Sequence, residues 1–153
     1  DKNTVCIFTK DTHENNYMNT LEGKNLPVPH CIKGTPGHSI VDEVMMAYSC
    51  KDYKDPWEVY PLAMNNPLRV EKPTFGSIDL QDILWTMNGI EPIEEINFVG
   101  LCTGICVMSN AILTKATLPE IPVNVIADCC ACVTPESHKT ALKAMKLCQI
   151  NII

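Results

Sequence analysis

The stretch GLCTGICV (100–107) follows an apolar run and precedes a helical pattern, so Cys106 falls at the turn into a helix. Free backbone N–H groups and the helix dipole favour an anion there, so a thiolate forms more readily than at the ordinary cysteine pKa of about 8.5. The same N–H groups can stabilise an oxyanion during acyl transfer. Cys106 is therefore a candidate nucleophile; the alternative is a packed thiol that faces the sheet.

A candidate metal site begins with Asp11 and His13, which follow the apolar run TVCIF. Residues two apart in an extended segment project to the same side, so both side chains could bind one metal ion. His30, in the sequence PHC, offers a further ligand. Two histidines and one carboxylate suit zinc, iron or manganese and leave coordination positions open. The alternative is a surface turn in which Asp11 is a cap.

Lys72 is the third candidate, because it ends the run LRVEK (68–72) and is followed by PTFGS. A cation close to a reacting thiol can stabilise the thiolate or carry a proton. The alternative is an ordinary solvated strand end. All three candidates follow predicted strands, and in an open parallel sheet ligands bind beyond the carboxyl ends of the strands.

Short β-rich runs alternate with helical patterns along the chain, which predicts an α/β fold with a parallel sheet and right-handed crossovers. The predicted strands cover residues 4–8, 68–72, 95–100, 122–127 and 149–153. The predicted helices run from Ser77 to a stop at Asn88-Gly89, from Cys106 to Lys115, and from Pro135 to Leu147 with Thr134 as N-cap. We expect one domain over residues 1–153.

Residues 11–67 form a long segment with little periodicity beyond a short helical patch around Ser39 to Ala47. This segment carries most of the prolines and three of the four histidines. Long loops of this kind in a compact domain are usually functional or disordered, and the histidines favour function.

The composition restricts the class of protein. With 46% hydrophobic and 20% charged residues and a net charge of −6, the chain resembles a soluble globular protein and not a nucleic-acid or membrane-surface binder. Nine cysteines, an odd number, favour reduced thiols and a cytoplasmic protein. Cys129, Cys130 and Cys132 could suggest a structural zinc site, but no second CxxC completes a four-ligand set.

Taken in order, five motifs resemble those of the nicotinamidase group within the isochorismatase-like cysteine hydrolases. They are DTH, PHCIKGTPGH, EKPTFGS, VGLCTGICVMSNA and IADCCACVTPESHKTAL, and together they span nearly the whole chain. The pair of DxH and PHC is specific, because it separates the metal-dependent nicotinamidases from metal-free relatives. The resemblance implies a three-layer, doubly wound α/β/α fold with a mostly parallel sheet.

The resemblance also implies roles for individual residues. It implies Cys106 as nucleophile beside Lys72, and a divalent metal on Asp11, His13 and His30 (zinc first, then iron or manganese). It implies an oxyanion hole from the N–H groups of Cys102 and Cys106, with a cis peptide between Leu101 and Cys102. The implied substrate pocket contains Phe75, Leu101 and Ile105. The implied reaction converts nicotinamide to nicotinate and ammonia through a thioester, as part of NAD salvage. The implied ligand is a small pyridine carboxamide. The resemblance is also compatible with a homo-oligomer.

Two departures from the family pattern stand out. Nothing in the chain matches the family's catalytic aspartate on its first strand, which lies centrally in the sheet, so we expect a longer natural chain with an N-terminal strand that is missing here. Gly104 stands where the family often has an acidic residue. The alternatives to a nicotinamidase are a related hydrolase of another small amide or of an isochorismate-type ether, a catalytically silent binding member, and a zinc domain built on the cysteines of 129–132.

Overall fold

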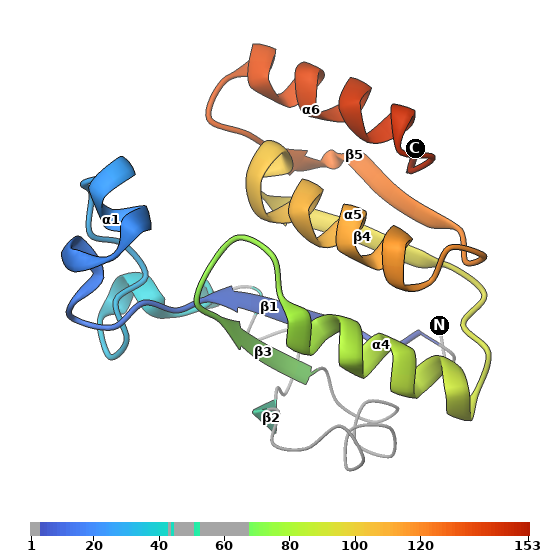
Figure 1. The fold of residues 1–153 in the computed structure, drawn as a ribbon, viewed down its shortest axis with the longest axis horizontal. Helices are drawn as coiled ribbons and strands as arrows, with labels where there is room; N and C mark the ends of the chain where they lie inside the picture. Colours follow the sequence, from blue (N-terminus) through green and yellow to red (C-terminus); the bar gives the residue numbers. More distant parts are fainter. Residues whose placement is uncertain (1–3, 43, 45–50, 53–67) are drawn as a thin grey trace. The chain divides into compact units, whose positions relative to one another are not determined.

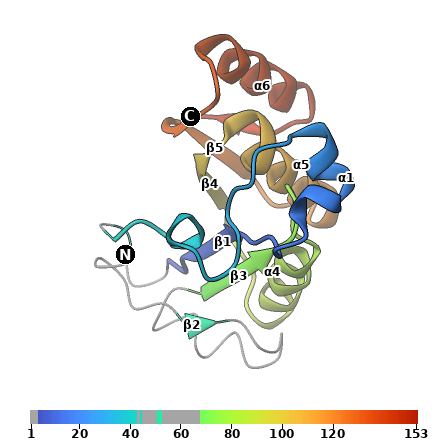
Figure 2. The same cartoon turned by 90° about the vertical axis from the view of Figure 1, so that its left-hand side faces the viewer.

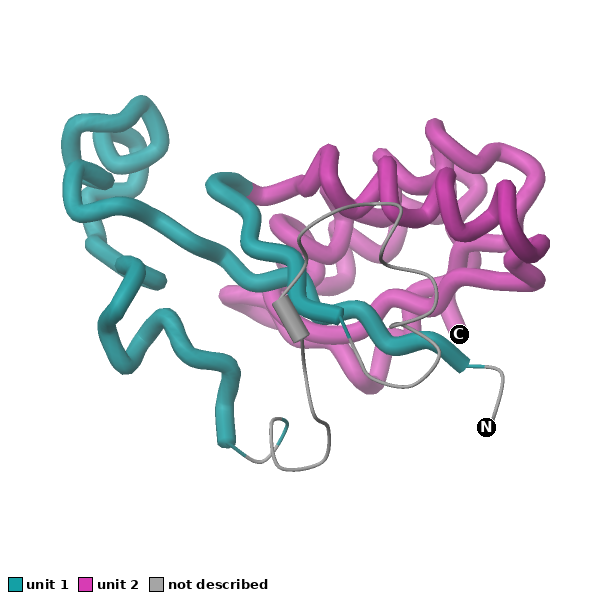
Figure 3. The backbone as a smooth tube through the Cα atoms, turned by 90° about the horizontal axis from the view of Figure 1, so that it is seen from below, with its two compact units in different colours: residues 1–74 teal, residues 75–153 magenta. Residues whose placement is uncertain are grey.

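The computed structural model describes residues 4–42, 44, 51–52 and 68–153. The described residues form two compact units, residues 1–74 and residues 75–153, which Figure 3 shows in two colours. Of the helical patch predicted around Ser39 to Ala47, residues 43 and 45–47 lie outside the described residues. Each unit contains one sheet of three parallel strands. The predicted α/β class with parallel strands is therefore confirmed.

The first unit is organised around β1 (Ile7–Asp11) and β3 (Leu68–Lys72), which run parallel in Figure 1. The two-residue β2 (Lys51–Asp52) extends the sheet on the other side of β3. Among the described residues that follow β1, the chain forms short helical turns at η1 (Tyr17–Asn19), α1 (Leu21–Asn25) and η2 (Pro36–His38). The prediction of a strand at 4–8 was three residues too early, because Ile7 pairs with Leu68 and the ladder continues to Asp11 and Lys72.

The second unit contains the sheet β4–β5–β6 and three longer helices, which Figure 2 shows from the side. The strands are β4 (Ile96–Leu101), β5 (Val123–Ala131) and β6 (Asn151–Ile152). The helices are α4 (Ile78–Ile90), α5 (Met108–Thr117) and α6 (Pro135–Leu147), with a π-helical turn η3 (Thr103–Val107) before α5. β1 and β4 each lie at the edge of their own sheet.

One face of the second sheet carries the core. Val123 and Val125 of β5 are fully buried and pack with Ala111 of α5 and Met145 of α6. Burying each side chain of this size contributes about 1.5–3 kcal/mol relative to exposure. Residues on one side of a strand alternate with those on the other, so Val123 and Val125 face the helices together.

The helix starts follow the local sequence. Thr134 caps α6 by accepting a hydrogen bond from Ser137 N, and Ser137 Oγ accepts one from Thr134 N, which completes a capping box with Pro135 in the first turn. Ser77 caps α4 in the same way through Leu80 N. The predicted N-cap Thr134 is confirmed.

Two predicted helix boundaries were wrong. Helix α4 passes Asn88-Gly89 and ends at Ile90, and the Asn88 side chain accepts a hydrogen bond from Ile93 N just beyond that end. The helix predicted from Cys106 begins instead with the π-helical turn, so that α5 starts at Met108. No helix within the described ranges is both long and apolar enough to cross a membrane.

Candidate functional site

The first cluster of functional side chains lies at the carboxyl end of β1. Asp11 was predicted just past the strand end but is the last residue of β1, and His13 follows it and pairs with Ile32. His13 N donates to Cys31 O over 3.0 Å, and Lys33 N donates to His13 O over 2.8 Å. These two bonds hold the segment that follows His30 against the end of β1.

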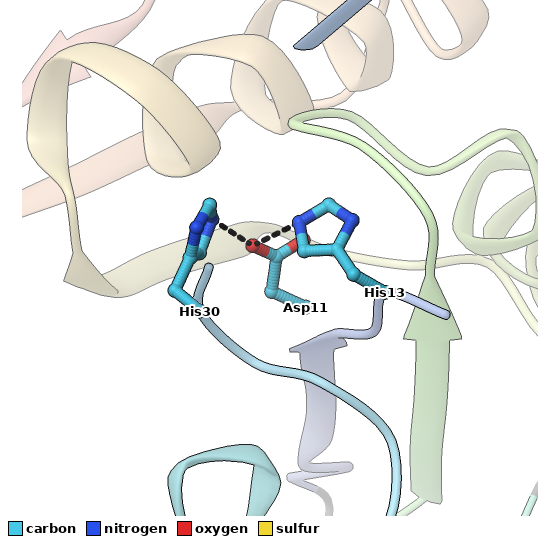
Figure 4. A group of neighbouring side chains, drawn as sticks. All are labelled: Asp11, His13 and His30. Atoms are coloured by element: carbon cyan, nitrogen blue, oxygen red, sulfur yellow. Dashed lines mark ion pairs between the residues drawn. The ribbon is translucent and has the colours of Figure 1, made fainter. Parts of the chain in front are cut away.

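Asp11, His13 and His30 meet as the sequence predicts (Figure 4). One ligand atom from each lies within 4.8 Å of the others. Asp11 Oδ2 is 3.3 Å from His13 Nε2 and 3.5 Å from His30 Nε2. His30 Nδ1 lies 2.8 Å from Val28 O, so Nδ1 donates its proton there and Nε2 is left with a lone pair toward the cluster.

Glu22, which sequence reasoning missed, belongs to the same cluster. Its Oε1 lies 3.5 Å from His13 Nε2 and 3.9 Å from His30 Nε2. His13 Nε2 and Glu22 Oε1 are both buried and make no hydrogen bond within the described part of the chain. A buried imidazole nitrogen and a buried carboxylate oxygen without such bonds are costly unless a cation satisfies both. This donor set fits a zinc, iron or manganese ion.

Tyr17 forms the wall behind these ligands. Its ring centroid lies 4.6 Å from that of His13 and 5.0 Å from that of His30, and its hydroxyl donates to Leu26 O over 2.9 Å. Burial, followed by the negative charges of Glu22 and Asp11, raises the pKa of the Tyr17 hydroxyl above its ordinary value. Tyr17 therefore stays neutral, and its buried ring packs against both imidazoles.

Lys72 is buried, with 2% of its surface exposed, so the solvated strand end is excluded. Its Nζ donates to Asp11 Oδ1 over 3.1 Å and to Thr74 O over 2.9 Å. The two carboxylate oxygens of Asp11 are thus divided: Oδ1 contacts the ammonium, and Oδ2 contacts the imidazoles. A buried ammonium is tolerated here because an anion compensates its charge.

In the second unit, the nucleophile candidate Cys106 lies in the π-helical turn Thr103–Val107 and is half-buried. The peptide bond between Leu101 and Cys102 is cis, as the resemblance implies. Cys102 O accepts hydrogen bonds from Ile105 N and Val107 N, at 3.0 and 3.2 Å. These bonds form the π-helical turn that leads into α5, where the sequence predicts an anion-stabilising position.

Asn110 fixes this turn and was also missed. Its Nδ2 donates to Cys106 O over 2.9 Å and to Phe75 O over 3.2 Å, and its Oδ1 accepts from Ser77 N over 2.9 Å. The side chain is almost fully buried. One amide therefore ties the backbone of the nucleophile candidate to the segment that begins α4.

Thr103 and Gly104 shape the rest of the turn. The fully buried Thr103 Oγ1 lies 2.8 Å from His138 Nδ1 of α6. A Cβ on Gly104 would come within 3.3 Å of Ala141 Cβ and 3.4 Å of Cys132 Sγ. A larger side chain at 104 would push against α6, which gives a physical reason for glycine where the resemblance leads us to expect an acidic residue.

The neighbouring thiols differ in their environments. Burial, then the thiols of Cys132 and Cys106, raises the pKa of Cys102. A hydrogen bond with the Ser137 hydroxyl lowers the pKa of Cys132. Burial acts in the opposite direction and raises it, whereas the Gly104 and Val133 N–H groups lower it further. Cys130 packs against the core and its pKa is raised by burial, whereas Cys129 is exposed. Among the described residues, the group of side chains that could hold a metal ion is that of Asp11, His13 and His30 and includes no cysteine, so the zinc alternative on the cysteines finds no support.

The residues that the resemblance assigns to the substrate pocket are placed differently from one another. Ile105 lines a cavity of about 550 Å³ between the π-helical turn and the start of α6, together with Cys132 and Thr134. Phe75 and Leu101 do not line this cavity; both side chains are exposed, Leu101 by 68%.

The structure is similar to several solved structures. The nicotinamidase PncA from Bacillus subtilis superposes with a TM-score of 0.72 at 22% identity, over 98% of this chain and 75% of that one. The pyrazinamidase of Pyrococcus horikoshii in complex with zinc gives 0.68 at 20% identity, over 99% and 76%. PnC1 from L. infantum in complex with nicotinate gives 0.65 at 14% identity, over 96% and 70%. At these identities the likeness shows a shared fold.

A sequence search of curated proteins gave no match. The family model described as the isochorismatase domain matches residues 1–153. This match covers every motif considered above, from DTH to the start of α6. The chain therefore belongs to the isochorismatase domain family.

Proposed function

We propose that the protein is a metal-dependent amidase that hydrolyses nicotinamide to nicotinate and ammonia. The observation that carries the proposal is the cluster at the end of β1. Three ligand atoms lie within 4.8 Å of one another, beside a fourth donor, and two of these atoms are buried without a hydrogen bond among the described residues. The solved nicotinamidases and pyrazinamidases of the same fold support the choice of substrate class.

In this proposal Asp11, His13 and His30 hold the metal ion, with Glu22 as a further donor. When bound, the ion supplies a Lewis-acidic position suited to the nitrogen of a pyridine ring. The proposal treats residues 1–153 as one hydrolase domain, a treatment that the family match over the whole chain supports.

The covalent chemistry is assigned to Cys106. Its thiolate attacks the carboxamide carbon, the amide nitrogen takes up a proton and leaves as ammonia, and water hydrolyses the thioester to give nicotinate and the free thiol. Lys72 is the proposed proton carrier, because its ammonium is buried and paired with a carboxylate. The backbone N–H groups of Cys102 and Cys106 are the proposed oxyanion donors.

Ammonia release from nicotinamide tests the proposal directly. We expect turnover by the protein loaded with one equivalent of zinc, iron or manganese, loss after treatment with a strong chelator, and recovery when metal is returned. Pyrazinamide serves as a second substrate, and benzamide, which lacks the ring nitrogen, as the matched control. Ammonia release that survives both chelation and loss of the Cys106 thiol would end the proposal.

Replacement of Glu22 by glutamine is expected to weaken zinc binding by about 10- to 100-fold, because the variant removes an anion beside His13 and His30 and keeps the side-chain shape. Zinc affinity is measured by competition with a fluorescent chelator. Glu14→Gln is the matched control, since the Glu14 side chain is exposed and, among the described residues, forms an ion pair with the exposed Lys33 at 3.9 Å. Equal zinc affinity in Glu22→Gln and wild type would remove Glu22 from the ligand set.

A further inference from the structure

His38 connects two segments of the metal-ligand cluster without being a ligand itself. It ends the turn η2 and is buried, with 8% of its surface exposed. Its Nε2 lies 2.9 Å from Thr12 Oγ1. Thr12 is the middle residue of the DTH motif, between Asp11 and His13. The contact therefore ties the segment that follows His30 to the segment that carries the other two ligands.

The protons at Thr12 can be assigned from its contacts. Its hydroxyl has one proton, which it donates to Lys10 O over 3.2 Å. The hydroxyl oxygen then accepts a hydrogen bond from His38, so Nε2 of His38 carries a proton. Thr12 N donates to Lys72 O over 2.9 Å. Three hydrogen bonds thus fix the one residue between the two ligands.

The charges around His38 keep its ring neutral. Burial, followed by the positive charge of Lys10, lowers the pKa of His38 below its ordinary value, with smaller contributions in the same direction from Lys33 and Arg69. Glu71, whose Oε1 lies 3.8 Å from Nε2, opposes them. The lowered pKa favours the neutral ring, and a neutral ring with its proton on Nε2 donates to Thr12.

Thr12 points away from the metal ligands. In an extended segment successive side chains project to opposite sides, so Asp11 and His13 share one side and Thr12 takes the other. His38 therefore acts from behind the ligand-bearing backbone and occupies no coordination position. We propose that His38 is a positioning residue of the metal centre, which holds Thr12 so that Asp11 and His13 stay aligned with His30; this inference rests on the proposed metal site.

Zinc affinity of matched variants tests the inference. We expect His38→Ala and Thr12→Val each to weaken zinc binding about tenfold, at the lower end of the range for groups that orient ligands. His38→Gln, whose amide can donate to Thr12, and Thr12→Ser, which keeps the hydroxyl, are expected to recover most of that loss. The double variant His38→Ala with Thr12→Val is expected to lose no more than either single variant, because both remove the same bond.

Two controls separate positioning from general destabilisation. Thermal unfolding of each variant is recorded in excess chelator, and His138→Ala, which removes a histidine hydrogen bond to Thr103 in residues 75–153, is expected to leave zinc affinity unchanged. Wild-type zinc affinity in a folded His38→Ala or Thr12→Val protein would overturn the role of His38 and leave the metal site standing. Failure of the wild-type protein to bind zinc would overturn the metal site and the role of His38 together.

Discussion

Replacement of Cys106 by alanine is expected to lower kcat for nicotinamide by at least about a thousandfold, because loss of a nucleophile leaves only binding and the oxyanion donors to accelerate the reaction. The backbone of the turn is held by Cys102 O and by the Asn110 side chain. These hydrogen bonds are made to backbone atoms of the turn, which the alanine variant keeps. The variant is therefore expected to fold. The steady-state rate of ammonia release at saturating nicotinamide gives kcat, and circular dichroism verifies the fold.

The matched control is Cys148→Ala, which removes an exposed thiol at the end of α6. This variant is expected to keep wild-type kcat and KM. Mass spectrometry after brief exposure to iodoacetamide adds a second readout, and we expect Cys106 to be alkylated first among the cysteines. A Cys106→Ala variant with more than a tenth of wild-type turnover would show that another group attacks the amide.

Regular elements were predictable because their signals are local. The run LRVEK alternates buried and exposed residues as β3, and Leu68 and Val70 are almost fully buried. Helix α6 begins where Thr134 and Pro135 predict, because a side-chain cap and a fixed φ are both encoded within a few residues. The proximity of the proposed metal ligands Asp11 and His13 was predictable for the same reason, since their spacing in an extended segment sets their common side.

The residues that sequence reasoning missed act across long stretches of irregular chain. Glu22 comes from a five-residue helix and His38 from a three-residue turn, and neither element has a hydrophobic period. Both lie in the segment 11–67, where the clustering of histidines predicts function but no contact partner. The available signal for Glu22 was its place between two candidate histidine ligands, since a carboxylate there can join them.

The turn around Cys106 shows a different limit. The sequence predicts a helix start there, and the structure has a π-helical turn before α5. Asn110 satisfies Cys106 O and Phe75 O together, and Phe75 is 35 residues away along the chain. Whether an asparagine within a helical pattern faces solvent or such a partner depends on tertiary contacts that periodicity does not encode.

Replacement of Lys72 by methionine is expected to have the second large effect, on stability and turnover together. The variant keeps most of the side-chain volume but removes the ammonium that donates to Asp11 Oδ1 and Thr74 O. Loss of one partner from a buried ion pair costs about 3–5 kcal/mol, and the partial exposure of Asp11 places this case near the lower value. Loss of a proton carrier lowers kcat by about 10²–10⁴.

Zinc binding separates the catalytic role of Lys72 from a purely structural one. A cation that competes for Asp11 is removed in Lys72→Met, so the folded variant is expected to bind zinc at least as tightly as the wild type while it turns over far more slowly. Lys143→Met, which changes an exposed lysine of α6, is the matched control and should alter neither property. If Lys72→Met kept wild-type kcat, the buried ammonium would serve only to balance the charge of Asp11, and the proton that ammonia needs would have to come from another group.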